Sequence, residues 1–225
     1  GAILDETTIL TAAHCLFWEI PSHLSVSVGS LLTTSNQNIY NVTSYTTYPT
    51  QPGTSPADYD DIAVLKLASS ITFTDNIKPI QLPTQDENQP AEHTVCQISG
   101  WGYTDTNEDR AVRLLKFLVR VQTNEECRDK WFLNPNSNLT LDIKDTHLCA
   151  GVSPVDAHAD PCLGYSGGPL TCIRSRNDGS TDDSVRVLYG IISIGDDPCG
   201  RENGRPGIYT RVSKYVNWIK QQMNS

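Results

Sequence analysis

Short runs of apolar residues, separated by Gly, Pro, Asn and Asp, recur along most of the chain. Such runs, bounded by residues that favour turns, are typical of antiparallel β-strands. The pattern therefore predicts an all-β protein. Strands are expected at Ser25–Val28, Val95–Ile98, Leu114–Val121, Leu170–Ile173 and Val185–Ile194.

Helix is predicted in only two places. Thr123-Asn-Glu-Glu126 has the spacing of a capping box, so a short helix is expected to begin there, ahead of Cys127. A second helix is expected near Ser213, because four apolar residues fall at i, i+3, i+4 and i+7 and form one face. These residues are Val212, Tyr215, Val216 and Ile219. The polar stretch Gln81–Glu92 holds two prolines and is predicted to be the crossing between two halves of the protein.

The length and the charge of the chain limit its function classes. With 225 residues, of which 38% are hydrophobic, the chain can bury one sizeable core or two fused cores. No apolar run approaches the ~18 residues that a membrane span needs. A net charge of -9 argues against nucleic acid as a partner and mildly favours cationic substrates. We therefore expect a soluble globular protein that binds neither nucleic acid nor a membrane.

The cysteines indicate an oxidising compartment. The chain has seven cysteines, widely spread and without a Cys-X-X-Cys pair, which is typical of a disulfide framework rather than a zinc site. Two sequons, Asn41-Val-Thr and Asn138-Leu-Thr, are candidate glycosylation sites and fit secretion. The chain opens at Gly1 without the features of a signal peptide, so any such peptide is expected upstream.

The stretch Asp160-Pro-Cys-Leu-Gly-Tyr-Ser-Gly-Gly-Pro-Leu170 has the composition of a nucleophile turn. Its glycines let the backbone turn sharply and hold the hydroxyl of Ser166 outward, while the N–H groups of Gly164 and Ser166 can point to one oxyanion. The Gly-X-Ser-X-Gly spacing alone also serves ordinary tight turns. A serine nucleophile therefore needs partner residues elsewhere in the chain.

Two candidate partners precede this stretch. His14 ends the apolar run Thr8-Ile-Leu-Thr-Ala-Ala-His, and Asp61 heads the strand-like run Asp61-Ile-Ala-Val-Leu-Lys-Leu67. The order histidine, aspartate, serine is one that nucleophilic hydrolases use. The remaining histidines, at positions 23, 93, 147 and 158, lie in polar segments and are expected at the surface.

With these motifs in place, the chain resembles the chymotrypsin/trypsin family of serine endopeptidases over nearly its whole length. The matching stretches are Thr11-Ala-Ala-His-Cys15, Asp61–Leu67, Ser99-Gly-Trp-Gly102, Cys162–Leu170, Pro206-Gly-Ile-Tyr-Thr-Arg-Val212 and Trp218-Ile219. The resemblance implies two packed antiparallel six-stranded β-barrels. The first would span residues 1–84 and be incomplete at its start, the second would span 85–212, and a short helix would cover 213–225.

The resemblance also implies the catalytic roles. His14 would take the proton of Ser166 as the serine attacks a peptide carbonyl, and Asp61 would hold the imidazole and stabilise its charged form. Asp60 is the alternative for the acidic role. Asp61 is preferred, because the run Asp-Ile-Ala-Val-Leu aligns on it and adjacent strand side chains point in opposite directions.

Specificity for arginine or lysine is implied by Asp160. The resemblance puts its carboxylate at the base of a pocket walled by Ser193, Gly195 and Gly207, where a cationic side chain would relieve a buried charge. Asp160 as a solvated loop residue is the alternative. Pro161 and Ile194 depart from the family pattern, in which a small residue and a tryptophan are more common. The expected partners are protein or peptide substrates and protein protease inhibitors, and the expected state is a monomer.

By resemblance, the disulfides are Cys96–Cys172, Cys127–Cys149 and Cys162–Cys199. Cys15 is left over, because its partner in the family lies just upstream of the stretch that begins here at Gly1. The domain is therefore expected to be incomplete at its start, and Cys15 to be a free thiol beside His14. No cofactor or metal is expected. The calcium loop of many relatives needs carboxylates, and residues 24–57 include no Asp or Glu.

Tyr165 is the sharpest departure from the family. Active members have an aspartate there, which pairs with the N-terminal ammonium that activation creates, and a tyrosine with an ordinary pKa of about 10 cannot supply that anion at neutral pH. Two hypotheses follow. In the first, the chain is a secreted endopeptidase in which Tyr165 hydrogen-bonds locally and the oxyanion hole is ordered in another way. In the second, it is a protease homologue that binds proteins without cleaving them.

Overall fold

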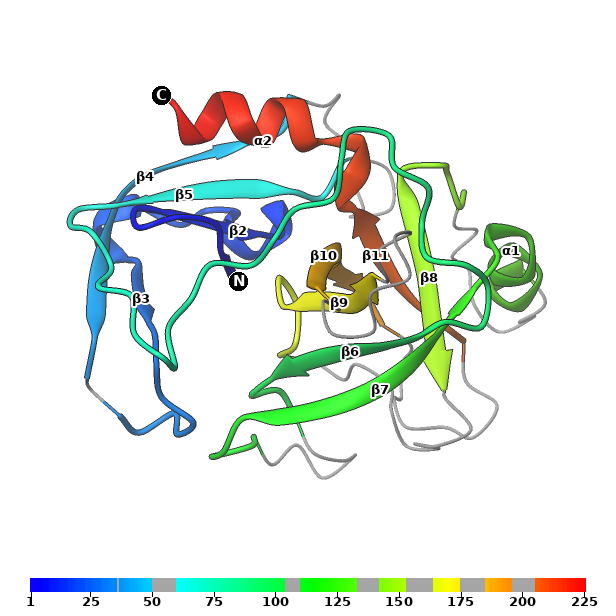
Figure 1. Ribbon diagram of the computed structural model, residues 1–225, viewed down its shortest axis with the longest axis horizontal. Helices are drawn as coiled ribbons and strands as arrows, with labels where there is room; N and C mark the ends of the chain where they lie inside the picture. Colours follow the sequence, from blue (N-terminus) through cyan, green and yellow to red (C-terminus); the bar gives the residue numbers. More distant parts are fainter. Residues whose placement is uncertain are drawn as a thin grey trace.

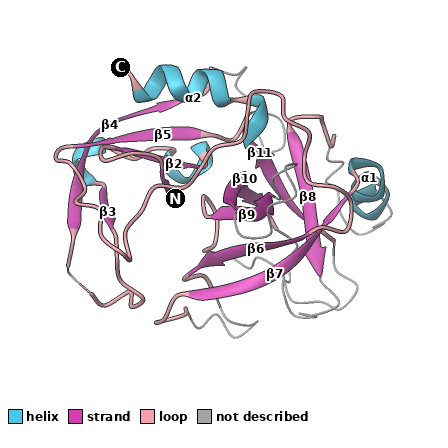
Figure 2. Ribbon diagram, viewed as in Figure 1, coloured by secondary structure: helices cyan, strands magenta, loops and turns pink. Residues whose placement is uncertain are grey.

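The computed structural model describes residues 1–35, 37–49, 60–103, 110–132, 142–152, 164–174, 185–195 and 205–225. These residues form an almost entirely β structure with two short α-helices, as predicted (Figures 1 and 2). No helix among them is long and apolar enough to cross a membrane. The strands are β1 (Ala2–Ile3), β2 (Thr8–Thr11), β3 (Ser25–Ser27), β4 (Ile39–Thr47), β5 (Ala63–Leu67), β6 (Val95–Gly100), β7 (Leu115–Gln122), β8 (His147–Val152), β9 (Pro169–Arg174), β10 (Val185–Ile194) and β11 (Gly207–Arg211).

The strands form two antiparallel sheets. The first, on the left of Figure 1, has the order β1-β2-β5-β4-β3 and is open, while the second closes into a barrel in the order β10-β11-β8-β7-β6-β9. Six strands therefore form the second barrel, as expected, and five form the first sheet within the described residues. A cavity of about 760 Å³ lies against the first sheet and is lined from both of its edge strands, by Ile3 on one side and Val26 on the other.

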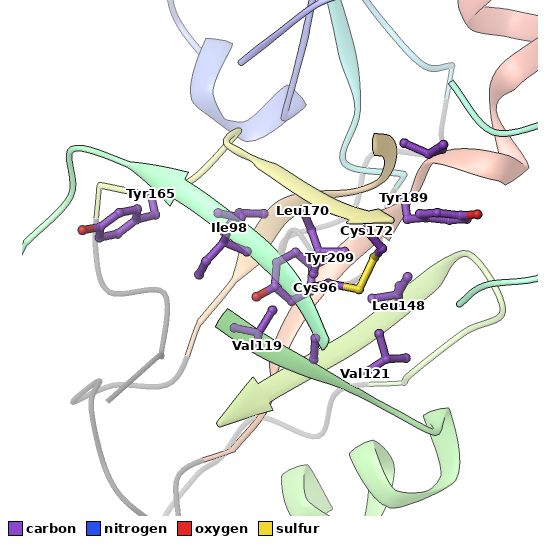
Figure 3. Packing of buried hydrophobic residues seen from close by; sticks show 13 residues of the cluster. Cys96, Ile98, Val119, Val121, Leu148, Tyr165, Leu170, Cys172, Tyr189 and Tyr209 are labelled. Atoms are coloured by element: carbon purple, nitrogen blue, oxygen red, sulfur yellow. A yellow bond between two sulfur atoms is a disulfide. The ribbon is translucent and has the colours of Figure 1, made fainter. Parts of the chain in front are cut away.

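Each sheet encloses an apolar core, and a third apolar cluster joins the two. The core of the second barrel includes Ile98, Val119, Leu148 and Leu170 (Figure 3). The joining cluster combines buried residues of the first sheet, of β10 and of the C-terminal segment. Burial on both sides of the contact therefore fixes one half of the molecule on the other.

The predicted capping box is present at α1 (Asn124–Phe132). The backbone N–H of Glu126 donates to Thr123 Oγ1 at 3.1 Å, and the backbone N–H of Thr123 donates to Glu126 Oε2 at 3.2 Å. These reciprocal bonds satisfy two donors at the helix start and fix where the helix begins.

The C-terminal segment is a 3₁₀ turn, Val212–Lys214, followed by α2 (Val216–Met223). The apolar residues predicted to form one face, Val212, Tyr215, Val216 and Ile219, are all buried. Lys66 Nζ of β5 also donates to the carbonyl of Met223 at 3.0 Å. The helix therefore packs on the first sheet, although it follows the last strand of the second barrel (Figure 1).

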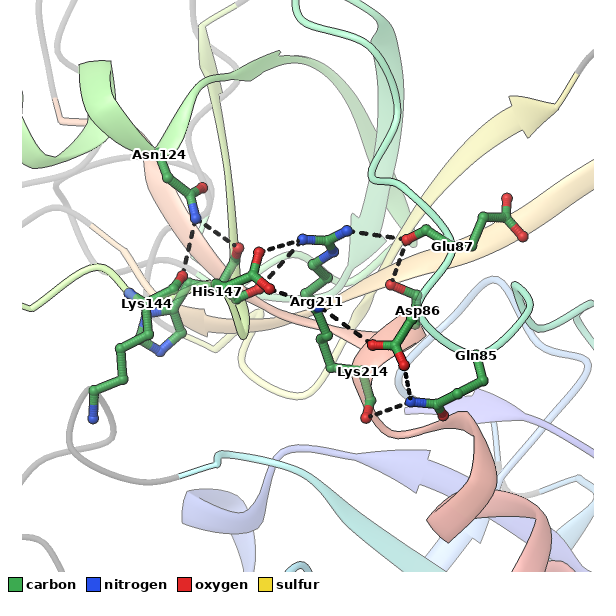
Figure 4. A network of polar contacts seen from close by, with 10 residues as sticks. Gln85, Asp86, Glu87, Asn124, Lys144, His147, Arg211 and Lys214 are labelled. Atoms are coloured by element: carbon green, nitrogen blue, oxygen red, sulfur yellow. Dashed lines mark hydrogen bonds and ion pairs between the residues drawn. The ribbon is translucent and has the colours of Figure 1, made fainter.

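The segment Gln81–Glu92 lies between the last strand of the first sheet and the first strand of the second barrel. Polar contacts hold it in place (Figure 4). Arg211 donates to the carbonyl of Glu87 at 3.0 Å and to Asp145 Oδ1 at 2.7 Å. The carboxylate of Glu87 accepts from Arg174 at 2.9 Å and from the hydroxyl of Tyr189 at 2.7 Å. The connection is thereby attached to β9, β10 and β11.

Two of the three predicted disulfides are present. Cys96–Cys172 joins β6 to β9, and Cys127–Cys149 joins α1 to β8. The predicted pair Cys162–Cys199 lies outside the described residues. Cys15 is a free and exposed thiol within the described part of the chain.

The prediction that His147 lies at the surface is wrong. His147 begins β8 and is 6% exposed, and its Nδ1 accepts a hydrogen bond from the backbone N–H of Lys144 at 3.1 Å. Burial lowers the pKa of this histidine. His23 and His93 are exposed, as predicted, and His158 lies outside the described residues.

Candidate active site

The pairing of β2 with β5 brings His14 and Asp61 together. The two strands are antiparallel, and Thr11 at the end of β2 is opposite Ala63 at the start of β5. His14 follows Thr11 within a 3₁₀ turn, Ala13–Leu16, and Asp61 shortly precedes Ala63. Both residues therefore lie at the same end of the strand pair, although 47 positions separate them in the sequence.

Asp61 holds His14 through two hydrogen bonds. The imidazole Nδ1 lies 2.7 Å from Asp61 Oδ2, and the backbone N–H of His14 donates to Asp61 Oδ1 at 2.8 Å. The side chain of Asp61 is 2% exposed and that of His14 is 21% exposed. Because both carboxylate oxygens accept bonds from the same residue, the ring is fixed in position and orientation.

The second barrel also holds Asp61. Ser193 Oγ of β10 donates to Asp61 Oδ2 at 2.5 Å, and Thr210 Oγ1 of β11 donates to the carbonyl of Asp61 at 2.7 Å. Sequence analysis placed Ser193 in a pocket wall and did not single out Thr210. The signal available in the sequence was polarity, since both residues interrupt apolar strands. The structure shows that both are buried.

The groups around His14 favour its protonated form. Burial of the His14 ring lowers its pKa, but the hydrogen bond to Asp61 and the contact with Cys15 outweigh burial and raise the pKa of His14 to about 10. A positive charge on His14 is thus strongly stabilised, which is the state that a base reaches after taking a proton.

Asp60 has a different partner. The hydroxyl of Tyr215, which precedes α2, donates to Asp60 Oδ1. The adjacent carboxylates therefore serve two separate contacts: Asp61 holds His14, and Asp60 holds the C-terminal segment against the first sheet.

Ser166 lies at the second position of a tight turn. The backbone N–H of Gly168 donates to the carbonyl of Tyr165 at 2.9 Å, which closes the turn Tyr165–Gly168. Gly167 has a φ of +75°, the value that the third position of a type II turn requires. The backbone N–H of Gly167 donates to the carbonyl of Ile192 at 2.8 Å, so β10 supports the turn and Ser166 is left exposed.

This turn packs directly against the His14 segment. A Cβ added at Gly167 would lie 2.3 Å from Thr11 Oγ1 and 3.3 Å from both the backbone nitrogen of Ala12 and Cys15 Sγ. Only glycine allows such a close approach. The structure therefore brings the Ser166 turn beside the His14–Asp61 pair. His14, Asp61 and Ser166 all lie within the described residues. Among these residues, no hydrogen bond joins Ser166 to His14.

Cys15 contacts the other nitrogen of the imidazole, since its Sγ lies 3.7 Å from His14 Nε2. The prediction of a free thiol beside His14 is thereby confirmed.

Tyr165 is buried, and its hydroxyl has no hydrogen-bond partner within the described structure. Among the described residues, the predicted local hydrogen bond of this hydroxyl is not found. The cause is the surrounding side chains, because the ring packs in the apolar core of the second barrel.

The remaining predicted site residues are only partly described. Gly164 has a φ of +90° and packs against Gly102, where an added Cβ would lie 3.0 Å from the Cα. Gly195 follows β10, and Gly207 begins β11 opposite Ala150 of β8. Asp160, the predicted pocket base, and Pro161 lie outside the described residues.

Comparison with known proteins agrees with this geometry. Residues 1–219 match the Trypsin family. The chain is 34% identical over 98% of its length to trypsin-1 from Astacus astacus, of which it spans 85%. It is 32% identical over 97% of its length to ovochymase from Halocynthia roretzi, but spans only 13% of that protein.

A solved structure shows the same fold. Neuropsin, a serine protease expressed in the limbic system of mouse brain, matches with a TM-score of 0.77 and 31% identity, over 98% of this chain and 86% of the neuropsin chain. Two packed β-sheets with a His–Asp pair beside a serine turn are characteristic of the trypsin-like class of serine proteases. The chain belongs to the trypsin family of that class.

Proposed function

We propose that this chain hydrolyses peptide bonds, with Ser166 as nucleophile, His14 as general base and Asp61 as the group that orients His14. The observation that supports this most directly is the buried Asp61 carboxylate, 2.7 Å from His14 Nδ1, with the Ser166 turn packed beside it. Such a carboxylate selects the tautomer whose Nε2 can accept a proton.

The reaction follows from this tautomer. Nε2 takes the hydroxyl proton as Ser166 Oγ bonds to the carbonyl carbon, and the resulting oxyanion is stabilised by the N–H groups of Gly164 and Ser166. The C–N bond then breaks, and Nε2 returns the proton to the leaving amine. Water hydrolyses the acyl-serine by the same steps and restores the hydroxyl.

We further propose that the enzyme cleaves after arginine or lysine, through Asp160 with Ser193, Gly195 and Gly207 around it. The net charge of -9 is consistent with a basic substrate. Protein inhibitors that present a basic residue would bind the same site. Secretion is supported by the two disulfides, and glycosylation is supported by an exposed sequon residue, Asn41.

Labelling by an organophosphonate tests this proposal. The probe should modify Ser166 in the folded chain, and paired arginine and phenylalanine amide substrates should show a preference for arginine. Ser166→Ala should abolish labelling without changing the circular dichroism spectrum. Labelling elsewhere, or equal labelling of Ser166→Ala, would overturn the assignment of the nucleophile.

A protein-binding role without turnover is the second candidate. It is favoured by the contact of Cys15 Sγ with His14 Nε2, the nitrogen that the serine proton must reach, and by Tyr165 in place of an acid. In that case the folded chain would resist the organophosphonate and still bind a basic protease inhibitor, with affinity reduced by Asp160→Asn.

A further inference from the structure

Tyr165 joins the serine turn to the core of the second barrel. Its backbone carbonyl closes the turn that presents Ser166, and its side chain is 2% exposed. Figure 3 shows the ring at one end of the apolar cluster, near Ile98, with Tyr189 at the opposite end. One residue thus belongs both to the exposed turn and to the buried core.

The space for the ring is built by two neighbouring strands. A Cβ added at Gly100 of β6 would lie 2.6 Å from Tyr165 Cδ1, so this position has room for the ring only because it is glycine. Phe117 of β7 contacts the ring edge-on, with centroids 5.7 Å apart and planes at 75°. The shape of this space therefore matches an aromatic side chain.

The ring of Tyr165, and not its hydroxyl, holds the side chain in the core of the second barrel. The hydroxyl is buried without a partner among the described residues, which opposes burial, whereas apolar contact of the ring favours it. Burial also raises the pKa of Tyr165 above its ordinary value. The side chain is therefore uncharged at neutral pH, and contact of the ring with the core does not depend on a charge.

We propose that Tyr165 is a positioning residue, whose buried ring fixes the turn Tyr165–Gly168 and so sets the orientation of Ser166. This deepens the proposed function and rests on it for the role of Ser166. Because Tyr165 is bonded directly to Ser166 and to Gly164, movement of its ring would displace the hydroxyl and the neighbouring N–H together. A displacement of about 1 Å can cost on the order of 100-fold in rate.

Substitutions at Tyr165 test the proposal. Tyr165→Ala should lower the rate of Ser166 labelling about 100-fold and should lower kcat on an amide substrate while KM changes little. Tyr165→Phe keeps the ring and removes the unpaired hydroxyl, so it should restore the wild-type rate. Leu148→Ala is the matched control, since Leu148 is buried in the same cluster but lies on β8; its folded form should react like wild type.

Gly100→Ala provides an independent variant. Its added methyl group would collide with the ring, so it should lower the labelling rate in the wild-type background. In Tyr165→Ala the ring is absent, and Gly100→Ala should then have no further effect. This coupling separates a displaced ring from a general loss of stability.

Hydrogen exchange tests the positioning role of Tyr165 independently of whether the chain is active as a protease. The amides of Gly167 and Gly168 are both hydrogen-bonded, and Tyr165→Ala should speed their exchange much more than Leu148→Ala does. If wild-type Ser166 were never labelled, the proposed function would fail, and the exchange rates would still decide whether the ring holds the turn. Unchanged protection of both amides in folded Tyr165→Ala would overturn the proposal.

Discussion

In the proposed mechanism, the two side chains that contact His14 set the pH range in which it can act as a base. Asp61 contacts Nδ1 and Cys15 contacts Nε2, and both contacts favour the charged ring. A general base must be neutral before it can accept a proton. With the pKa of His14 raised to about 10, activity is expected to rise as the pH increases toward that value.

Cys15→Ala should therefore move the pH profile toward lower pH. The substitution removes the hydrogen bond and the charge interaction with which Cys15 raises the pKa of His14, and leaves Asp61 in place. The pKa can be measured by NMR titration of the imidazole and, separately, from the pH dependence of Ser166 labelling. Cys15→Ser is the matched control, because it retains a hydrogen-bonding group and should shift the pKa less. An unchanged titration in Cys15→Ala would contradict the argument.

The residue scale also shows what the sequence could and could not predict. The pairing of His14 with Asp61 follows from a motif and its strand. The burial of Tyr165 does not, because its space is made by Gly100 and Phe117, which are distant in the sequence. The burial of His147 has a similar cause: its polar neighbours suggest a surface position, but pairing opposite Thr210 of β11 places it inside.

At the scale of elements, the sequence predicts the features that depend on neighbouring residues, such as where a helix begins and which of its faces is apolar. The capping box at Thr123 fixes the start of α1, and the apolar spacing from Val212 to Ile219 predicts the buried face of the C-terminal segment. What the spacing does not reveal is the surface that this face covers. It packs in a cluster that includes Leu10 and Val64 of the first sheet and Ile191 of β10, and so connects both halves.

Ile219→Ala tests the energetic importance of this contact. Ile219 is fully buried in the joining cluster, so its truncation should lower the free energy of unfolding by about 2–5 kcal/mol. Urea unfolding followed by circular dichroism measures the change. Lys220→Ala, at an exposed position of the same helix, should alter stability by less than about 0.5 kcal/mol. Equal effects of the two substitutions would show that α2 is not an important contact.

At the scale of the whole molecule, the connection between the two sheets is held by charge. Burial raises the pKa of Glu87, but hydrogen bonds from Thr84, Tyr189 and Arg174 outweigh burial and bring the pKa below its ordinary value. A lowered carboxyl pKa stabilises the folded state above the unfolded pKa of about 4.5, and this stabilisation is lost as the pH falls through the lower folded value.

Glu87→Gln should consequently destabilise the protein in a pH-dependent manner. At pH 7 the loss should be about 1.5–3 kcal/mol, because bonds to a charged group are replaced by bonds to a neutral amide. The difference from wild type should shrink toward pH 3 in parallel urea titrations. Asp75→Asn, at a fully exposed carboxylate, is the control and should show little effect at either pH. A difference that stays constant between pH 7 and pH 3 would exclude a role for the charge of Glu87.

The two hydrogen bonds by which β10 and β11 hold Asp61 affect when the site is completed during folding. Asp61 shortly precedes β5 of the first sheet, yet Ser193 and Thr210 reach it only once the second barrel has formed and docked. Before that docking, His14 and Asp61 lack the support of these two hydroxyls. The proposed hydrolytic activity should thus appear only after the two halves of the molecule have assembled, and an isolated first half should lack it.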